Sequence, residues 1–419
     1  PGLITGAADD DPSGITTYTQ AGATFGLGQV WLALYMLPLL IAVQEMCGRI
    51  GLVTGQGIAG VVRRHYRREV LLGAVLLVVV ANAINVGTDL GAMAAAARLL
   101  VPGLGFGILV VAFAVIVLGL EIFIPYRHYA RVLKVMTLSL LAYVLTGLVV
   151  APDWGRVALA ALVPNIHFDT TFLFLAVAVL GTTISPYLFF WQASEEVEED
   201  VLHHRRHDGA HDQRRAELAK GLEIKRLRAD TVLGMLASGV TNGFIIITAA
   251  VTLHAHGIGT VTTAEQAASA LQPLVRTFPH AGDLARGLFA VGIIGTGLLA
   301  VPILAGSAAY GVAEAFGWRE GLYRPFAQAR GFYGVIAAAT LVGLLINFLG
   351  VNPIQALVYT AVINGVAAVP LLVLILLVAN NREVMGQHVN GRLSNTIAIF
   401  TTLGMGAAAV ATVVSLWAH

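Results

Sequence analysis

Three consecutive carboxylates, Asp9, Asp10 and Asp11, lie in the middle of the first apolar stretch of the chain. A charge at the centre of a membrane helix costs roughly 2.5–3.5 kcal/mol on insertion scales, so such residues are as a rule functional. Pro12 removes a backbone donor and Gly14 permits non-helical dihedral angles, so we expect the helix to be broken here. Neighbouring positions do not share a helical face. We therefore expect Asp11 to meet a cationic substrate. At most one of Asp9 and Asp10 would meet it as well, while the other would pair with an Arg or line an entry path.

A second apolar stretch is interrupted in the same way. It reads Gly181-Thr-Thr-Ile-Ser185-Pro186-Tyr187-Leu, with a proline at mid-depth and hydroxyl groups beside it. The two interrupted stretches begin two successive sets of five expected helices, and an odd number of helices inverts the second set relative to the first. Interrupted helices at matching places in inverted repeats mark the substrate site of secondary transporters. Ser185 and Tyr187 are therefore further candidates for contact with the substrate.

The composition shows what must hold these breaks in place. Of 419 residues, 57% are hydrophobic and 12% are charged, whereas a soluble domain carries about 25% charged residues. We expect an all-α integral membrane protein with about eleven transmembrane helices. They are expected near residues 2–24, 28–50, 70–97, 105–124, 132–151, 171–200, 230–254, 283–312, 330–350, 353–380 and 395–417. Residues 1–151 would form a first inverted repeat, 152–380 a second that includes a basic loop at 201–229, and 381–419 one extra helix.

Positive charge alternates along the connections between these helices. All of the 25 Lys and Arg residues follow the second, fourth, sixth, eighth or tenth helix, except Arg98, Arg156, Arg276 and Arg286. Because cytoplasmic loops carry the excess of Lys and Arg, we expect a multi-pass protein of the inner membrane. Its N-terminus would be cytoplasmic and its C-terminus external. The sequence leaves open whether the native N-terminus is longer.

These residues resemble the Nramp family of divalent-metal transporters, which share the inverted-repeat architecture of the LeuT-type fold. The family's first helix carries Asp-Pro-Gly-Asn where this chain has Asp-Pro-Ser-Gly at 11–14. Its sixth helix carries Gly-Ala-Thr-Val-Met-Pro-His-Asn where this chain has the segment 181–188. Further similarity lies in Gln20-Ala21-Gly22, Thr88-Asp89-Leu90, Tyr126-Arg127, Lys134 and Leu138-Ser139. The resemblance covers the layout of the first ten helices.

Carried over position by position, the resemblance implies a metal site. Its ligands would be the Asp11 carboxylate and the carbonyl oxygens of Ala8 and Thr182. The family's Asn ligand falls on Gly14 and its Met ligand on Ser185, so both of those side chains are lost.

Other positions of the family pattern also differ. The His after the proline falls on Tyr187, the later His on Gln192, and the carboxylate that follows Thr-Asp-Leu on Ala92. The glutamine of the family's tenth helix has no clean match, and Asn364 and Gln355 are nearest.

The losses change the expected chemistry. Without the thioether the donors are all oxygens, from Asp9, Asp10, Asp11, Ser13, Ser185 and carbonyl groups. Oxygen donors suit Mg²⁺, Ca²⁺ or Mn²⁺, and Gly14 in place of Asn would make room for waters. We therefore expect a harder cation, Mg²⁺ or Mn²⁺, held partly hydrated. The lost histidines and carboxylate favour weak or no proton coupling, although Asp89 could still relay a proton.

Two other functions stay open from the sequence alone. The same losses, with the aromatic residues Tyr187, Phe189, Phe190 and Trp191 near the second break, would also suit an organic cation or amino-acid-like solute. A non-transporting sensor or scaffold could use the basic loop to bind a partner. Asn82 and Asn85 are interpreted as interhelical hydrogen-bonding residues. We expect no enzymatic activity, no cofactor besides the cation substrate and no nucleic-acid partner, and the oligomeric state is open.

Overall fold

The computed structural model of the chain describes residues 2–124, 138–150, 152–204 and 213–417, and these are helical with no strand. Its α-helices are α1 (Gly2–Asp9), α2 (Pro12–Phe25), α3 (Val30–Thr54), α4 (Ile58–His65), α5 (Arg68–Leu100), α6 (Phe106–Phe123), α8 (Leu141–Val150), α9 (Trp154–Leu162), α10 (Thr170–Thr183), α11 (Pro186–His204), α12 (Gln213–Thr252), α13 (Ala264–Ser269), α14 (Gln272–Val275), α15 (Ala281–Phe316), α16 (Arg330–Ile346), α17 (Pro353–Asn380), α18 (Arg382–Met385) and α19 (Arg392–Trp417).

The expected number of membrane spans is confirmed for the described residues. Eight helical stretches are long and apolar enough to cross a bilayer, and the first of them contains two helices, α2 and α3. Two shorter apolar helices, Leu138–Val150 and Arg330–Ile346, complete the eleven. Part of the fifth expected span, with the Tyr126-Arg127 and Lys134 motif, lies outside the described residues.

One element differs from the expectation. The basic loop predicted at 201–229 is largely helical, because α11 continues to His204 and α12 begins at Gln213. The segment 213–229 is rich in Ala, Leu, Glu, Lys and Arg, which favour a helix, but it does not form an apolar run that would mark a helix in the sequence. Residues 205–212 lie outside the described part of the chain.

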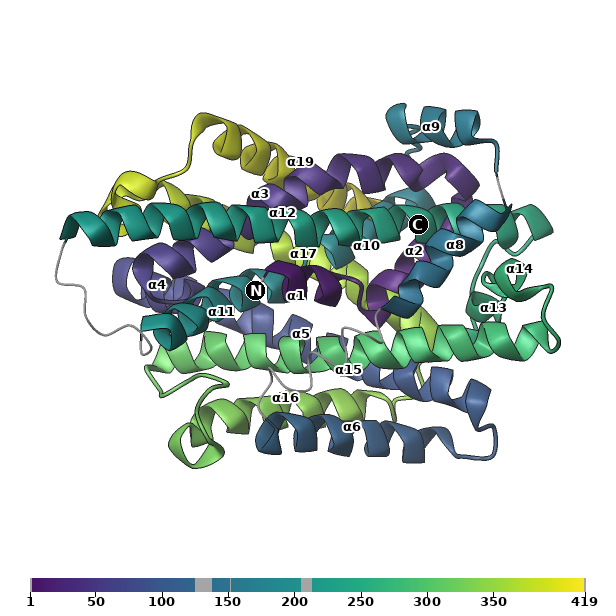
Figure 1. Cartoon of the computed structure of the whole chain (residues 1–419), viewed down its shortest axis with the longest axis horizontal. Helices are drawn as coiled ribbons and strands as arrows, with labels where there is room; N and C mark the ends of the chain where they lie inside the picture. The colour runs from purple at the N-terminus through teal and green to yellow at the C-terminus, as the bar shows by residue number, and fades with distance from the viewer. Residues whose placement is uncertain (1, 125–137, 151, 205–212, 418–419) are drawn as a thin grey trace.

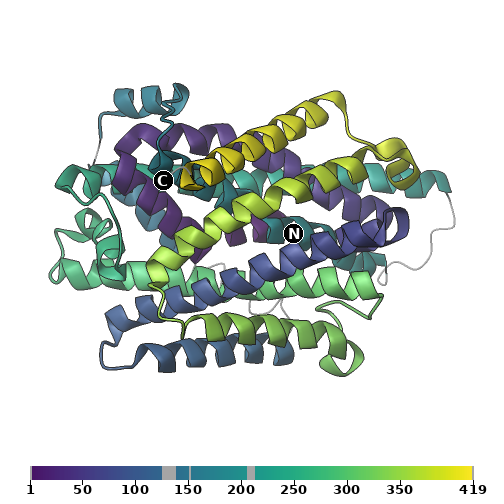
Figure 2. The same ribbon diagram turned by 180° about the vertical axis from the view of Figure 1, so that it is seen from behind.

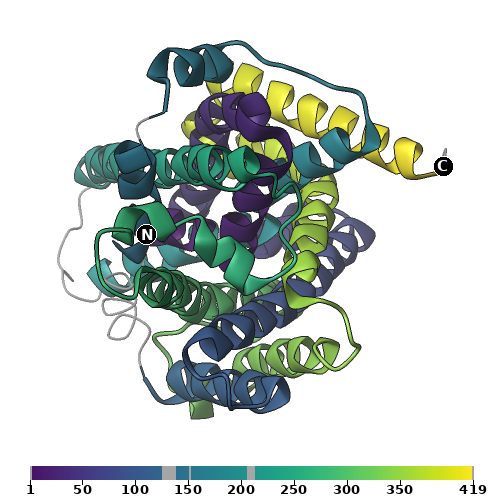
Figure 3. The same ribbon diagram turned by 90° about the vertical axis from the view of Figure 1, so that its right-hand side faces the viewer.

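The long helices run roughly parallel and antiparallel along one axis (Figure 1). The helix α4, the start of α12 and the end of α15 lie at one end of the bundle, and α9, α13 and α14 lie at the other (Figure 1). At the first of these ends, polar contacts join the helices. Arg63 of α4 donates to the carbonyl oxygen of Glu314 of α15 at 3.3 Å, and Arg228 of α12 pairs with Glu45 of α3 at 2.9 Å. We call this end the basic end. Figure 3, which looks along the bundle, shows α6 and α16 on one side and α19 on the other.

The C-terminal helix α19 packs along α17, as the view from behind shows (Figure 2). The segment before it is held by Arg49, which is 3% exposed. The guanidinium of Arg49 bonds to the carbonyl of His388 and the side chain of Asn390, and it pairs with Glu45 at 3.1 Å. The extra helix is therefore fastened to α3 at the basic end.

The interior of the bundle is built on very close helix contacts at glycines. A Cβ on Gly6 would lie 2.4 Å from the carbonyl oxygen of Gly234, and one on Gly22 would lie 2.3 Å from that of Ile246. The two helices of the first break, α1 and α2, therefore both lie with their backbones against α12. On the outside, large apolar side chains such as Ile108 and Leu403 are 66% and 68% exposed, as a lipid-facing surface requires.

Candidate cation site at two helix breaks

The first break is formed by Asp10 and Asp11, between α1 and α2. Asp11 has extended backbone angles (φ −68°, ψ 170°) and caps α2, since its Oδ1 accepts hydrogen bonds from the backbone N–H of Gly14 and the hydroxyl of Ser13, both at 2.7 Å. Pro12 follows at the first helical position, where its missing N–H costs nothing. Asp11 is 1% exposed. The break therefore fixes a buried carboxylate with one oxygen, Oδ2, directed away from its own helix cap.

The second break, at Ile184 and Ser185, separates α10 from α11. The Ser185 hydroxyl is 2.6 Å from the carbonyl oxygens of both Gly181 and Thr182, so it bonds back to its own helix. The hydroxyl of Thr182 lies 3.1 Å from that of Ser13. The two breaks thus meet through the side chains of Ser13 and Thr182.

Tyr187 makes a second bridge between the breaks. Its hydroxyl donates to the carbonyl oxygen of Ala8 at 2.9 Å and lies 3.4 Å from Asp11 Oδ2. Ser307 on α15 donates to the Tyr187 carbonyl at 2.9 Å and fixes the start of α11. The structure therefore brings together the residues Ala8, Asp11, Ser13, Thr182, Ser185 and Tyr187 that the sequence indicated.

The helix α5 contributes two polar residues to the same region. Asn85 Nδ2 donates to Asp11 Oδ2 at 3.5 Å. Asp89, one turn further along the same face, is 0% exposed, and neither of its oxygens has a hydrogen-bond partner among the described residues. Asn82 donates to the carbonyl oxygen of Leu304 at 2.9 Å and so links helices, as expected. For Asn85 the sequence interpretation was incomplete, because it did not foresee the contact with Asp11.

Asp9 and Asp10 face a different helix from Asp11. Both contact the hydroxyl of Ser238 on α12, at 2.5 Å and 3.1 Å. Gln192 also lies apart from Asp11, since its Oε1 accepts from Thr5 at 2.5 Å and its Nε2 donates to Glu196 at 3.0 Å.

Of the two candidates on α17, the structure brings only Asn364 near the breaks. Asn364 is 1% exposed, and its side chain has no partner among the described residues. Its neighbour Gly365 touches Gly181, where a Cβ would lie 2.3 Å from the Gly365 nitrogen. Gln355 lies apart from the breaks, because it is exposed in the first turn of α17, roughly 14 Å along the helix from Asn364.

The position of Gly14, beside which we expected waters, has close neighbours. A Cβ on Gly14 would lie 3.2–3.3 Å from the carbonyl oxygen of Asp9, the hydroxyl of Thr182 and the ring of Tyr18. Tyr18 fills this position because its hydroxyl is held by Thr183 at 2.7 Å. An Asn side chain at position 14 would therefore require these neighbours to shift by a few tenths of an ångström.

The aromatic residues that follow Tyr187 do not line the breaks. Phe189, Phe190 and Trp191 are at most 1% exposed and belong to hydrophobic clusters of the bundle. The Trp191 ring lies edge-on to Tyr310, with 6.3 Å between centroids. These residues pack helices together and leave Tyr187 as the aromatic side chain of α11 that meets Asp11.

The charges around the breaks are unbalanced. Asp9, Asp10, Asp11 and Asp89 are all at most 5% exposed. None of the ion pairs found among the described residues includes any of them. Buried carboxylates without basic partners are costly unless a cation or proton compensates them. This arrangement is suited to holding a positive ion.

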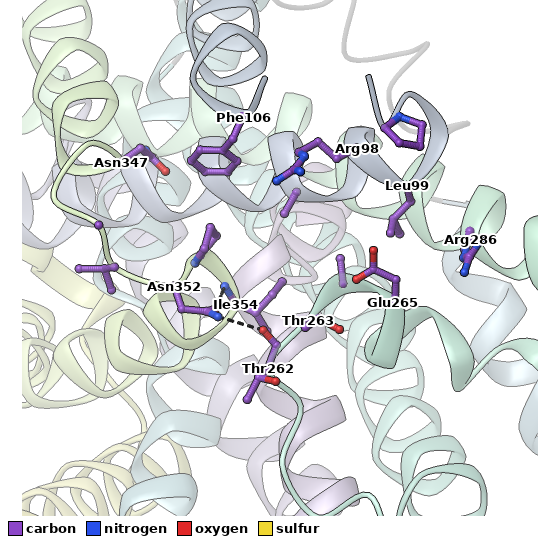
Figure 4. A pocket seen from close by; sticks show the side chains of 16 residues that line it. Arg98, Leu99, Phe106, Thr262, Thr263, Glu265, Arg286, Asn347, Asn352 and Ile354 are labelled. Carbon is purple, nitrogen blue, oxygen red and sulfur yellow. Dashed lines mark hydrogen bonds between the residues drawn. The ribbon is translucent and has the colours of Figure 1, made fainter. Parts of the chain in front are cut away.

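A pocket of about 730 Å³ opens at the end of the bundle opposite the basic end. Figure 4 shows Arg98 and Arg286 at its wall, with Asn352 donating to the carbonyl of Thr262 at 3.1 Å. Ile354 also lines it and belongs to the same hydrophobic cluster as Ile15, one turn after Asp11. A hydrophobic cluster therefore reaches from the lining of this pocket to the first turn of α2.

The chain is similar in sequence to proteins of a known family. The family model for Nramp, described as natural resistance-associated macrophage protein-like, matches residues 2–415. The divalent metal cation transporter MntH of Klebsiella pneumoniae is 28% identical over 422 residues, which cover 99% of this chain and 91% of that protein. The MntH of Yersinia pestis is 27% identical over 414 residues, covering 95% and 90%.

A solved structure shares the fold as well. The manganese transporter of Eremococcus coleocola aligns with a TM-score of 0.74 at 17% identity, covering 99% of this chain and 86% of that one. The fold is of the LeuT type, with an inverted repeat and two interrupted helices. With the family match spanning nearly its whole length, this chain belongs to the Nramp family of membrane transporters.

Proposed function

We propose that this chain transports divalent metal cations by alternating access, and that the ion binds between the two helix breaks. The observation that carries the proposal is the position of Asp11, a buried carboxylate at the junction of α2 and α11 without a basic partner among the described residues. The names of the Klebsiella and Yersinia relatives support the same substrate class.

The ligands follow from the groups that meet at the breaks. The Asp11 carboxylate supplies charge, and the carbonyl oxygens of Ala8 and Thr182 and the hydroxyl oxygen of Ser185 replace water around the ion. Each of the two carbonyls accepts one hydrogen bond, from Tyr187 and from Ser185 respectively. A carbonyl oxygen has two lone pairs, so both remain able to bind a metal. Tyr187 and Ser185 would hold them in position.

The proposed ion is hard, Mg²⁺ or Mn²⁺. The groups around Asp11 are carboxylate, carbonyl, hydroxyl and amide, and such oxygen donors favour these ions over softer transition metals. Tyr187 and Gln192 stand where the resemblance places histidines, so the site lacks the usual proton carrier near neutral pH. We therefore propose weak or no proton coupling, with Asp89 beside an aqueous path.

The proposed movement uses the two repeats, 1–151 and 152–380, with α19 outside them. One helix bundle, with members from both repeats, would rock about the site formed by the breaks. The basic end would face the cytoplasm, because cytoplasmic loops are rich in Lys and Arg. The pocket lined by Arg98 and Arg286 would then be the external entrance.

Uptake into proteoliposomes tests the proposal. The purified chain is reconstituted with dyes for Mg²⁺ or Mn²⁺ and for pH inside the vesicles. Wild type should take up the ion without acidification, and Asp11→Asn should lower uptake by roughly tenfold or more, because it removes a charged ligand. The control is Asp169→Asn, since Asp169 also caps a helix but is exposed at the start of α10. Equal uptake by wild type and Asp11→Asn would refute the site, and acidification during uptake would refute uncoupled transport.

A further inference from the structure

Ser238 of α12 stands between two carboxylates of the first break. Its oxygen is 2.5 Å from Asp9 Oδ2 and 3.1 Å from Asp10 Oδ1. A serine has a single hydroxyl proton, so it can donate to one carboxylate only, and the other close oxygen–oxygen contact has no proton from it. Asp9 Oδ1 has no hydrogen-bond partner among the described residues. None of the ion pairs among the described residues includes Asp9 or Asp10.

Asn242, one turn after Ser238 on α12, is directed into the same cluster. It is 1% exposed, and its Nδ2 donates to Ser238 Oγ at 3.3 Å. Its Oδ1 has no partner within the described part of the chain. Leaving a buried polar group unpaired costs roughly 1–3 kcal/mol, so such atoms are uncommon in native structures. The amide nitrogen thus faces the cluster through Ser238, and a turn of the side-chain amide would present the unpaired oxygen to a cation there.

We propose that Asp9, Asp10, Ser238 and Asn242 form a second cation site, separate from that at Asp11, for a hard divalent cation. All of the donors are oxygens, which is the set that Mg²⁺, Mn²⁺ and Ca²⁺ prefer. A divalent ion balances the two carboxylates, whereas a monovalent ion leaves one negative charge buried. The end of α1 at Asp9 adds the partial negative charge of a helix C-terminus.

The proposed second site differs in its donors from a cluster of acidic or His and Cys side chains. They contain no group of three or more His, Cys, Asp or Glu side chains that could hold a metal. The second site has only two carboxylates and depends on the hydroxyl and amide of α12, with waters completing the shell, as Mg²⁺ usually requires.

The second site lies on the path from Asp11 to the basic end. The N-terminal end of α1 reaches a pocket of about 430 Å³, where the Gly2 N–H donates to Asp230 at 2.6 Å. Asp9 is seven positions further along the chain, or about 10 Å. Five acidic residues and one arginine line the pocket: Glu196, Glu199, Asp200, Glu223, Asp230 and Arg226. A cation that leaves Asp11 would thus meet Asp9 and Asp10 before an acidic exit, and closely spaced sites ease such release.

Counting bound Mn²⁺ tests this site, which rests on the proposed function only for the class of ion. The full chain in lipid nanodiscs is titrated with Mn²⁺ alone, and free Mn²⁺ is measured by electron paramagnetic resonance. Wild type should bind two ions per chain. The double variant Ser238→Ala/Asn242→Leu should bind one, Asp11→Asn should bind one, and the three changes together should bind none.

Two further variants keep the result interpretable. Thr241→Ala changes an exposed hydroxyl on the same helix that bonds only to its own backbone, and it should keep both ions. Asn242→Asp adds a carboxylate and should tighten the second site by tenfold or so, even if the double variant does not fold. A single ion in wild type, lost in Asp11→Asn, would overturn the second site while leaving the proposed function intact. Two ions in wild type that the α12 variants leave unchanged would overturn it as well.

Discussion

The hydroxyl of Tyr187 donates a 2.9 Å hydrogen bond to the carbonyl oxygen of Ala8, so the second helix break holds the end of the first. The same hydroxyl is 3.4 Å from Asp11 Oδ2. The Ala8 carbonyl lies at the end of a helix, where its intrahelical partner is missing. The Tyr187 hydroxyl therefore fixes it beside the Asp11 carboxylate. One phenol group thus orients two of the proposed ligands.

Tyr187→Phe should weaken uptake without unfolding the protein. The ring remains and the hydroxyl is lost, which removes a hydrogen bond worth about 0.5–1.5 kcal/mol. We expect the concentration for half-maximal Mn²⁺ uptake to rise roughly two- to tenfold, measured in proteoliposomes. Tyr143→Phe is a control, because Tyr143 is also buried and none of the hydrogen bonds among the described residues joins it to Ala8 or Asp11. Unchanged uptake by Tyr187→Phe would show that the Ala8 carbonyl needs no such support.

Ser185→Cys should move selectivity towards softer ions. The thiol stands at the place of the hydroxyl, and its sulfur, although larger than oxygen, prefers soft metals. Uptake of Cd²⁺ should increase relative to Mg²⁺, as competition assays in proteoliposomes can measure. Ser185→Ala, which removes the hydroxyl without adding sulfur, should show no such gain. A Cd²⁺ to Mg²⁺ ratio equal to that of wild type would mean that position 185 does not meet the ion.

Gly181→Ala should destabilise the protein. A Cβ at this position would lie 2.1 Å from the carbonyl oxygen of Ala361 and 2.3 Å from the nitrogen of Gly365. Such overpacking costs typically 1–3 kcal/mol, so the apparent melting temperature in detergent should fall. Gly119→Ala is the matched control, because nothing lies within 4 Å of a Cβ there. A helix prefers alanine, so this variant should melt at the wild-type temperature or above, and a fall as large as that of Gly181→Ala would contradict the packing argument.

Glu320, in the connection between α15 and α16, should make stability depend on pH. Burial raises the pKa of its carboxyl to about 9, with further increases from Glu314 and Glu198 and a decrease from Arg324. The folded chain therefore holds this proton more tightly than the unfolded chain, whose carboxyl has a pKa near 4.5. The contribution of the protonated Glu320 carboxyl to the free energy of unfolding is complete below pH 4.5 and is lost as the pH rises towards 9.

Glu320→Gln should remove this dependence. The variant should melt above wild type at pH 9, and the difference should vanish near pH 4. Melting curves in detergent across this range measure it. Glu69→Gln, at a side chain that is 77% exposed, should leave the curve unchanged. A wild-type pH dependence that persists in Glu320→Gln would assign it to other groups.

Much of the fold could be predicted from the sequence because apolar runs and charge are strong signals in a membrane. The breaks at Asp11 and Ser185 follow from proline beside polar residues, and both are confirmed. The start of α12 at Gln213 could not be read in this way, because a polar helix outside the bilayer gives no apolar signal. Helix boundaries there depend on propensities that differ by less than about 1 kcal/mol.

The residues around the breaks could be predicted only in part. Asp11 and Tyr187 were indicated by their place in an apolar stretch, whereas Asn85 and Ser238 come from other helices. Ser238 and Asn242 stand four positions apart on an otherwise apolar segment, and this spacing on one helical face was an available signal. Which helix that face meets is decided by packing between distant segments, and the sequence does not encode it locally.

The glycine contacts of α12 with both halves of the first span also restrict how the protein can move. Where backbones touch at Gly6 and Gly22, no side chains stand between the helices to change rotamer and absorb a sliding motion. Large displacements in proteins occur mainly at hinges, while packed helices shift by only small amounts. The first and seventh spans are therefore expected to move together as one rigid body. The carboxylates between them would stay together while the surrounding helices move.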